Sequence, residues 1–328
     1  MVFEGYERPL SSWLNREFYR GEKLDCLTII LKSGGCAWSR CLMCGYRTFR
    51  FPPISEEELG LRMRAQLRWI QENYRDSHFD MVKIFTSGSF FDPAEVPPEV
   101  RRKAAELFRG KLVIAETRPE YVNRDVLEDF ISVIDEGVWD IPLYVAMGLE
   151  TTDDAIREKS IGKGFDLESY RKAVDRAHSS GAGVKSYLLL KPPFLTEGEA
   201  IADMKKSIRE ASRWSEIVSM NPCTVQSGTE VEQLWRKGAY RPPYLWSILE
   251  ILIGAEGHLL CDTVGAGTQR GAHNCGECDR ELTQAIKDYT LSGERAPLTS
   301  AWEKGCRCMV EWEFVKREER PYCMPLTR

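Results

Sequence analysis

Three cysteines near the start of the chain are spaced to hold one inorganic centre. Cys36, Cys41 and Cys44 fall within nine residues, just after the apolar run 27–31. Thiolates at such short spacing can bind a cluster or ion without help from distant segments. A structural zinc site and an electron-transfer iron–sulfur cluster each take four protein ligands. Three cysteines on a four-iron cluster leave one iron free for a small ligand. The alternative is a zinc site in which Cys26 or a more distant cysteine is the fourth ligand.

A second group of metal-ligand residues lies towards the end of the chain. A Cys-x2-Cys pair and a Cys-x-Cys pair have the types and spacing of a structural zinc site. We expect a zinc ion held by ligands drawn from His273, Cys275, Cys278, Cys306 and Cys308. Cys261 and Cys323 are alternative ligands, a second iron–sulfur cluster would need the same residues, and free buried cysteines are the plain alternative.

The composition limits the kind of protein. Of 328 residues, 43% are hydrophobic and 29% charged, which is ordinary for a globular protein in water. We see no apolar run of about 18 residues and no signal peptide, so we expect a cytoplasmic protein with no membrane contact. In that compartment, eleven cysteines indicate metal ligation rather than disulfides. The net charge of −5 means that a nucleic-acid substrate would need a local basic patch or a partner that carries it.

Apolar runs alternate with amphipathic stretches from residue 27 onwards, which predicts βα units around a parallel sheet. The expected strands are 27–32, 81–87, 111–117, 143–150, 184–191 and 217–225. The expected helices are 55–75, 97–109, 119–136, 166–181 and 197–213. This pattern predicts an α/β fold, a partial (β/α)6 barrel over residues 27–225. We expect a helical lead-in over 1–26 and a cysteine-rich C-terminal extension over 226–328 with the zinc site.

In parallel α/β folds the chemistry lies at the carboxyl ends of the strands, where the three-cysteine loop also falls. Four more polar stretches end expected strands. They contain the small residues Ser87, Gly88 and Ser89, the pair Glu116 and Arg118, Glu150 with Lys163 downstream, and Lys191. Small residues let a backbone approach a ligand closely. The alternatives are a plain turn, a buried ion pair between Glu116 and Arg118, and a solvated surface lysine at Lys163.

In this order, the cysteine loop and the strand-end residues resemble the radical S-adenosylmethionine (SAM) enzymes over residues 27–225. One departure is that four residues, not three, separate the first two cysteines. The resemblance implies a 4Fe-4S cluster on Cys36, Cys41 and Cys44, with SAM on the open iron. It further implies SAM contacts from the residues Met43, Ser87, Gly88, Ser89, Glu116, Glu150 and Lys163. Glu116 and Lys191 are the expected catalytic residues, the lysine as a substrate contact.

The run Glu116-Thr117-Arg118-Pro119 is similar to the branch that contains the Elongator catalytic subunit and the methylthiotransferases. With the His-Asn-Cys-x2-Cys tail, the chain most resembles the archaeosine synthase β subunits. That resemblance implies a lyase acting on lysine-modified 7-cyano-7-deazaguanine in the tRNA D-loop. The implied partners are tRNA and the lysine-adding α subunit, with an electron donor that the sequence does not identify. The alternatives are a radical SAM enzyme acting on a small metabolite or a protein, and a non-enzymatic zinc protein.

Overall fold

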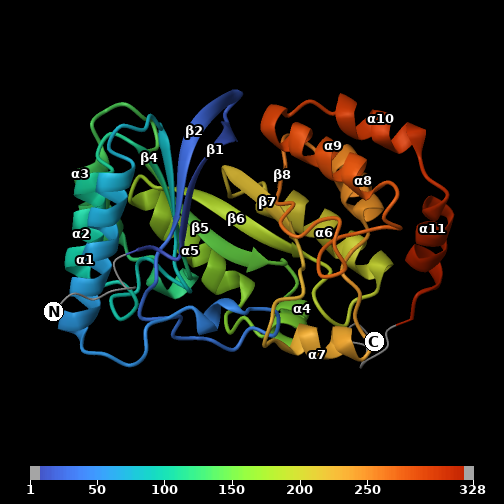
Figure 1. Cartoon of the computed structure of the whole chain (residues 1–328), viewed down its shortest axis with the longest axis horizontal. Coiled ribbons are helices and arrows are strands. Elements are labelled where there is room, and N and C mark those ends of the chain that lie inside the picture. Colours follow the sequence, from blue (N-terminus) through green and yellow to red (C-terminus); the bar gives the residue numbers. More distant parts are fainter. Residues whose placement is uncertain (1–7, 321–328) are drawn as a thin grey trace.

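The strands form one curled sheet whose spatial order follows the chain. In the computed structural model, which describes residues 8–320, eight strands pair in the order β1 to β8 (Figure 1). β1 is antiparallel to β2, and every later strand is parallel to its neighbour. The strands are β1 Ser11–Tyr19, β2 Glu22–Ile30, β3 Met81–Phe85, β4 Leu112–Thr117, β5 Leu143–Glu150, β6 Gly183–Leu190, β7 Ile217–Pro222 and β8 Leu260–Cys261. The prediction of a partial barrel of parallel βα units is confirmed.

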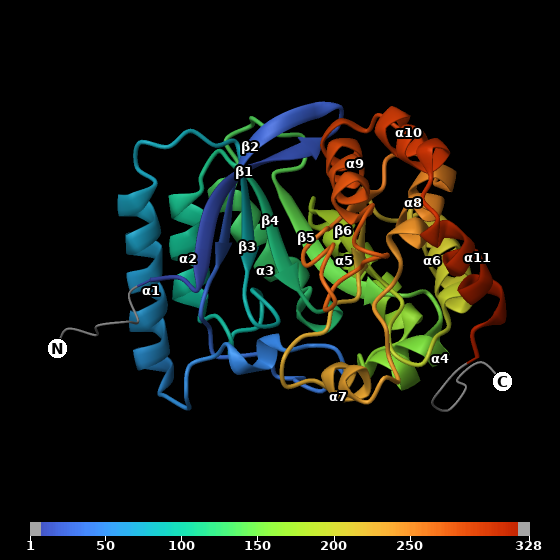
Figure 2. The ribbon, with the colours of Figure 1, turned by 45° about the vertical axis from the view of Figure 1, so that its right-hand side comes forward.

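The helices up to residue 211 alternate with these strands and cover the outer face of the sheet (Figure 2). The longer helices of the described chain are α1 Glu56–Asn73, α2 Pro98–Leu107, α3 Arg124–Ile134, α5 Leu167–Ser179, α6 Glu197–Ala211, α8 Leu245–Gly254, α9 Asp279–Ser292, α10 Ala296–Lys304 and α11 Cys308–Glu318. The short ones are α4 Asp154–Ile156, which continues into a π-helical turn, and α7 Glu230–Arg236. The five helices expected before residue 226 are all present. α3 begins later than expected because the Asn123 side chain caps its first turn, accepting from two backbone amides.

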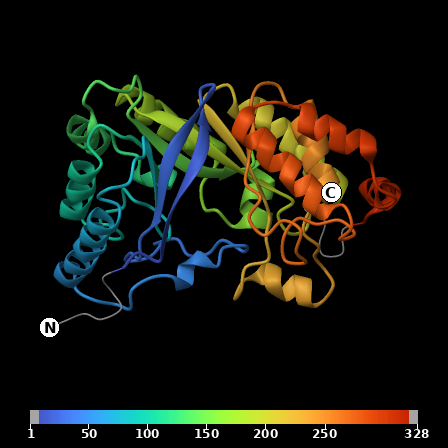
Figure 3. The same ribbon diagram turned by 45° about the horizontal axis from the view of Figure 1, so that its top comes forward.

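The expectation of a helical lead-in is wrong. Residues 11–30 form the β1–β2 hairpin (Figure 3), while residues 1–7 lie outside the described part. Alternate β1 side chains point into the barrel: Asn15 donates to Glu17 at 2.6 Å, and the Tyr19 and Tyr144 hydroxyls lie 3.1 Å apart. Mixed aromatic and charged residues therefore follow the period of a strand with one face buried, not the period of a helix.

The hairpin also narrows the open side of the barrel. The Phe18 ring of β1 packs against His258, just before β8, with ring centroids 4.2 Å apart. A small buried apolar cluster fills the barrel below the cavity at the carboxyl ends of the strands. It includes Tyr19, Cys26, Met81, Leu112 and Tyr144. The sheet and its flanking segments therefore enclose a space that is open at the carboxyl ends of the strands and filled below.

After residue 225 the chain forms α7 and α8, returns to the sheet as β8, which pairs with β7, and continues as α9 to α11, which form a bundle with α8. Trp302 of that bundle makes edge-to-face contacts with Trp246 and Trp312. We retain residue 225 as a proposed boundary in sequence between barrel and extension. None of the helices within residues 8–320 combines the length and apolar character needed to cross a membrane.

Candidate active site

A cavity of about 260 Å³ opens at the carboxyl ends of the parallel strands. One side is formed by Cys36, Cys41, Met43 and Cys44 from the loop after β2. Its other walls come from the ends of β3 to β7, with further residues from the segment that follows β8. The cavity therefore lies where a parallel α/β fold is expected to carry out its chemistry.

The three-cysteine loop is held in place by segments far along the chain. The Leu42 amide donates to the Ile161 carbonyl at 2.9 Å, and the Gly45 amide donates to the Gln226 side chain at 2.6 Å. The loop runs beside α4 and α7 in Figure 2. Gly88 must be glycine, since a Cβ there would lie 2.6 Å from that of Cys36. The second strand-end segment thus packs directly against the first cysteine.

The thiols suit a thiolate-bound metal centre. All three cysteines are free, and burial raises the pKa of Cys41 to about 11 and also raises the pKa of Cys44. Metal binding is what would deprotonate such thiols. Among the described residues, these three do not form a group with all ligand atoms within 4.8 Å, unlike the C-terminal cysteines below.

The small-residue turn after β3 divides between two roles. Ser87 and Gly88 line the cavity, as expected of cofactor-contacting residues. Ser89 does not line it: its amide donates to Glu95 at 2.7 Å, and its hydroxyl accepts from the Arg118 amide at 3.1 Å. Ser89, 1% exposed, ties this turn to the next strand end, so its expected SAM contact is not supported.

Glu150 and Lys163 form an ion pair at the cavity wall, with 2.5 Å between Lys163 Nζ and Glu150 Oε1. Glu150 has a φ of +66°, and the β5–β6 register shifts between Gly148 and Glu150, which turns the carboxylate inward. Burial lowers the pKa of Lys163, but the Glu150 carboxylate outweighs it and holds that pKa above its usual value. Lys163 is therefore not the solvated surface lysine of the alternative interpretation.

The side chains of Glu116 and Arg118, at the end of β4, have different partners and do not pair with each other. Arg118 pairs with Glu120 at 2.5 Å, donates to the Lys163 carbonyl at 3.0 Å, and lies over the Trp38 ring. Glu116 lines the cavity, and burial raises its pKa to about 8. The alternative of a buried pair between Glu116 and Arg118 is thus wrong.

Lys191 is directed away from the cavity. The residue is 2% exposed, has a φ of +56°, and its ammonium lies 2.8 Å from the Glu197 carboxylate. Glu197 in turn accepts from the Tyr244 amide at 2.9 Å. Lys191 is not among the described residues that line the cavity, so its expected substrate contact is not supported. It instead joins the end of β6 to the helices α6 and α8.

Lys191→Met is accordingly expected to lower the free energy of unfolding by about 3–5 kcal/mol, because it leaves the Glu197 carboxylate buried without its counter-ion. Denaturant unfolding would measure this loss. The double variant Lys191→Met/Glu197→Gln should recover much of it. Loss of activity in a fully stable Lys191→Met protein would restore the catalytic assignment.

Several cavity residues were not predicted from the sequence. They are Tyr46, Tyr187, Leu189, Asn221, Gln226, Asp262 and Val264. Asp262 follows the two-residue strand β8, where its amide donates to the Met220 carbonyl at 3.0 Å. A strand this short has no detectable alternation, so only the pairing with β7 reveals where its end lies.

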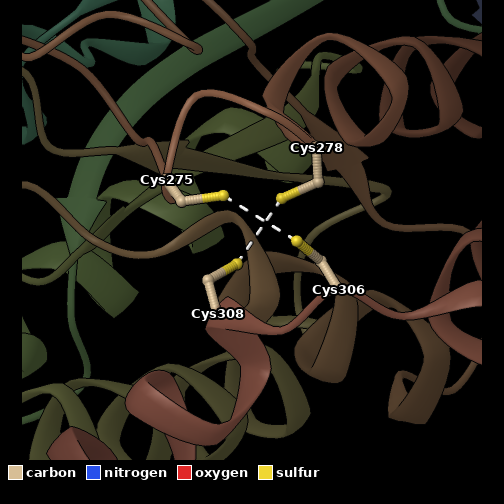
Figure 4. Close-up of side chains that lie close together, drawn as sticks. All are labelled: Cys275, Cys278, Cys306 and Cys308. Carbon is tan, nitrogen blue, oxygen red and sulfur yellow. Dashed lines mark hydrogen bonds between the residues drawn. The ribbon is translucent and has the colours of Figure 1, made fainter.

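Four C-terminal cysteines converge on one point (Figure 4). All ligand sulfurs lie within 4.8 Å of one another: Cys275 and Cys306 are 3.8 Å apart, and Cys278 and Cys308 are 3.7 Å apart. Asn274 and Trp246 direct N–H groups at the sulfurs of Cys278 and Cys308, at 3.4 and 3.3 Å. Such outer donors are typical of metal thiolate sites.

Of the other expected ligands, His273 is not in this group, and its Nδ1 lies 2.8 Å from the Gly271 carbonyl. Cys261 is buried at the end of β8, and Cys323 lies outside the described residues. The site is therefore made of four cysteines without histidine. A tetrahedral four-thiolate set of this size fits zinc.

Comparison with known proteins gives several matches over almost the whole chain, and two of them are to archaeosine synthase subunits. The chain is 39% identical to the archaeosine synthase subunit beta of Methanosarcina acetivorans, over 97% of this chain and 93% of that protein. It is 33% identical to the archaeosine synthase subunit beta of Thermococcus kodakarensis, over 93% and 96%. A solved structure of Methanocaldococcus infernus Elp3 aligns with a TM-score of 0.49 at 17% identity, over 76% of this chain and 60% of that one. A scan against protein-family models gives no match.

Proposed function

The chain belongs to the family of archaeosine synthase β subunits, and from this membership we propose that it is a radical SAM lyase that completes archaeosine in tRNA. The similarity to the two named relatives over almost the whole chain carries the proposal. The placement of Cys36, Cys41 and Cys44 at a cavity on the carboxyl ends of the strands supports it.

The cofactors of this reaction are a 4Fe-4S cluster and SAM, and the residues present fit both. Cys36, Cys41 and Cys44 would hold the cluster. When bound, the reduced cluster and SAM supply a 5′-deoxyadenosyl radical that abstracts hydrogen from the substrate. Met43 adds an apolar surface for adenine, and Ser87 and Gly88 let the backbone approach the SAM amino group. Glu150 would accept from the ribose hydroxyls, and Lys163 would neutralise the SAM carboxylate.

The substrate follows from the family. We propose tRNA whose D-loop carries 7-cyano-7-deazaguanine joined to the side-chain nitrogen of a lysine. Hydrogen loss beside that nitrogen and cleavage of the carbon–nitrogen bond would leave the formamidine on the base. The lysine-adding α subunit would be the partner, and its contacts with tRNA would reconcile a nucleic-acid substrate with a net charge of −5. A zinc ion on the four C-terminal cysteines would be structural.

Glu150→Gln is expected to raise the KM for SAM about 10- to 100-fold, because charged hydrogen bonds to the ribose are each worth about 1.5–3 kcal/mol. Steady-state formation of 5′-deoxyadenosine would measure the change. Glu120→Gln is the matched control, since Glu120 pairs with Arg118 but does not line the cavity. Equal effects of the two substitutions would argue against a ribose contact.

The function itself is tested on anaerobically purified protein. Iron and zinc are counted, and 5′-deoxyadenosine is then measured after reduction with SAM, with and without lysine-modified tRNA. About four irons per chain and faster product formation with that tRNA are the expected result. Product independent of tRNA would contradict the substrate, and zinc alone after cluster reconstitution would contradict the enzyme.

A further inference from the structure

The charged side chains that line the cavity wall are satisfied by partners within the protein. Lys163 pairs with Glu150, and Arg118 pairs with Glu120. At the rim, Asp262 accepts from the Val264 amide at 2.9 Å, which closes its own turn. Glu116 is the exception: its backbone carbonyl accepts from Phe90, but within residues 8–320 its carboxylate has neither a hydrogen bond nor an ion pair. One carboxylate therefore faces the cavity without a partner.

A second unpaired charge lies deeper in the barrel. Lys185 is 4% exposed, and its ammonium lies 5.0 Å from the centroid of the Tyr187 ring. In the described part of the chain, this ammonium has no hydrogen bond and no carboxylate within ion-pair distance. Its neighbour Lys83 does have one, since Lys83 pairs with Glu17 of β1. A buried ammonium without a counter-ion is costly, so Lys185 needs a structural or functional explanation.

The strand register places the two unpaired charges on either side of one small residue. Glu116 of β4 is opposite Ala146 of β5, and Ala146 is opposite Lys185 of β6. Glu116 and Ala146 both line the cavity, as does Tyr187, two residues beyond Lys185 on the same face of β6. Strands two positions apart are separated by about 10 Å. Glu116 thus borders the cavity on one side of the Ala146 methyl group, and Lys185 lies at the same level on the other side, beneath Tyr187 and outside the described residues that line the cavity.

We propose that the bottom of the cavity around Ala146 binds the amino-acid end of the substrate's lysine, with the α-ammonium on Glu116 and the α-carboxylate on Lys185. The proposal rests on the proposed function, in which lysine is joined through its side-chain nitrogen and both α groups remain free. A ligand with one positive and one negative group completes both pairs at once. Lys185 would reach the α-carboxylate of the ligand beside the Tyr187 ring. Tyr187 would then form the wall between this subsite and the rest of the cavity.

The ionisation of the two residues agrees with this assignment. Burial raises the pKa of Glu116 to about 8 and lowers the pKa of Lys185 to about 8, so each charged form is disfavoured in the empty site. An ammonium beside Glu116 would lower its pKa, and a carboxylate beside Lys185 would raise its pKa. The zwitterion would therefore favour the charged form of both residues.

The test compares three tRNAs that differ only in the group joined to the modified base, here called the arm. The arms are lysine, 1,5-diaminopentane, which lacks the carboxylate, and 6-aminohexanoate, which lacks the ammonium. The readout is kcat/KM for 5′-deoxyadenosine formed above the tRNA-free rate. The wild type should prefer lysine over each truncated arm by about 10- to 100-fold. The Lys185→Met variant should lose only the preference for lysine over diaminopentane. The Glu116→Gln variant should lose only the preference for lysine over aminohexanoate.

The double variant Lys83→Met/Glu17→Gln is the matched control, because it removes a neighbouring interior ion pair as a whole and leaves no unpaired carboxylate beside Lys185. It should lower stability and leave all arm preferences unchanged. A wild type that treats the three arms alike would overturn the proposal without any variant, which covers the case of a Lys185→Met protein that does not fold. Equal loss on every arm in the variants would also overturn it. A wild type that lysine-modified tRNA does not stimulate would overturn the proposed function and this assignment together.

Discussion

Cys41→Ala is expected to remove the iron and reduce 5′-deoxyadenosine formation to background, a loss of well over about 100-fold. Outer-shell changes around a metal cost about 10- to 100-fold, and a lost ligand should cost more. With one cysteine missing, only two thiolates remain to hold the cluster. No other histidine, cysteine, aspartate or glutamate of residues 8–320 forms a close ligand group with them that could replace the third. Iron content and absorbance near 400 nm provide readouts that do not depend on activity.

The matched control for this experiment is Cys26→Ala. Cys26 precedes the loop, is fully buried in the small apolar cluster below the cavity, and approaches only the Thr28 hydroxyl at 4.0 Å among polar groups described. It should keep its full iron content and lose only some stability, as expected for a small buried side chain. Zinc in place of iron, lost from both Cys26→Ala and Cys41→Ala, would instead favour the alternative of a zinc site in which Cys26 is the fourth ligand.

Cys278→Ser is expected to release one zinc per chain and to lower the melting temperature by roughly 10 °C or more. Zinc binding by cysteine-rich sites contributes many kcal/mol to folding, and each kcal/mol shifts the melting temperature by about 2–4 °C in a domain of this size class. The four sulfurs join the turn before α9 to the start of α11, 30 residues apart for Cys278 and Cys308. Removing the metal therefore separates two segments that pack beside α8.

Cys261→Ala is the control here, because Cys261 is a buried cysteine of the same region outside the four-sulfur group. Metal analysis and thermal unfolding of both variants decide the question. Full zinc content in Cys278→Ser would contradict the four-cysteine site. Iron rather than zinc, lost only in Cys278→Ser, would identify a second iron–sulfur centre.

The sequence by itself determined the features that depend on local spacing or on a repeated pattern. The close spacing of Cys36, Cys41 and Cys44 brings three thiols onto one loop whatever the rest of the chain does. The alternation of apolar runs and amphipathic stretches specified six parallel strands and their helices, because each period buries a defined face. The two C-terminal cysteine pairs were likewise readable as half-sites.

Only the tertiary structure decided which polar residues face the cavity. Beyond the end of a strand, alternation no longer applies, so Ser87 faces inward while Ser89 holds a turn, and Lys191 turns away to Glu197. The register shift after Gly148 points Glu150 inward. Lys185 stands near the start of a strand with no motif around it, and it gains significance only from its register with Ala146 and Glu116. These positions depend on pairing between distant segments, and a single sequence does not encode that pairing in any local pattern.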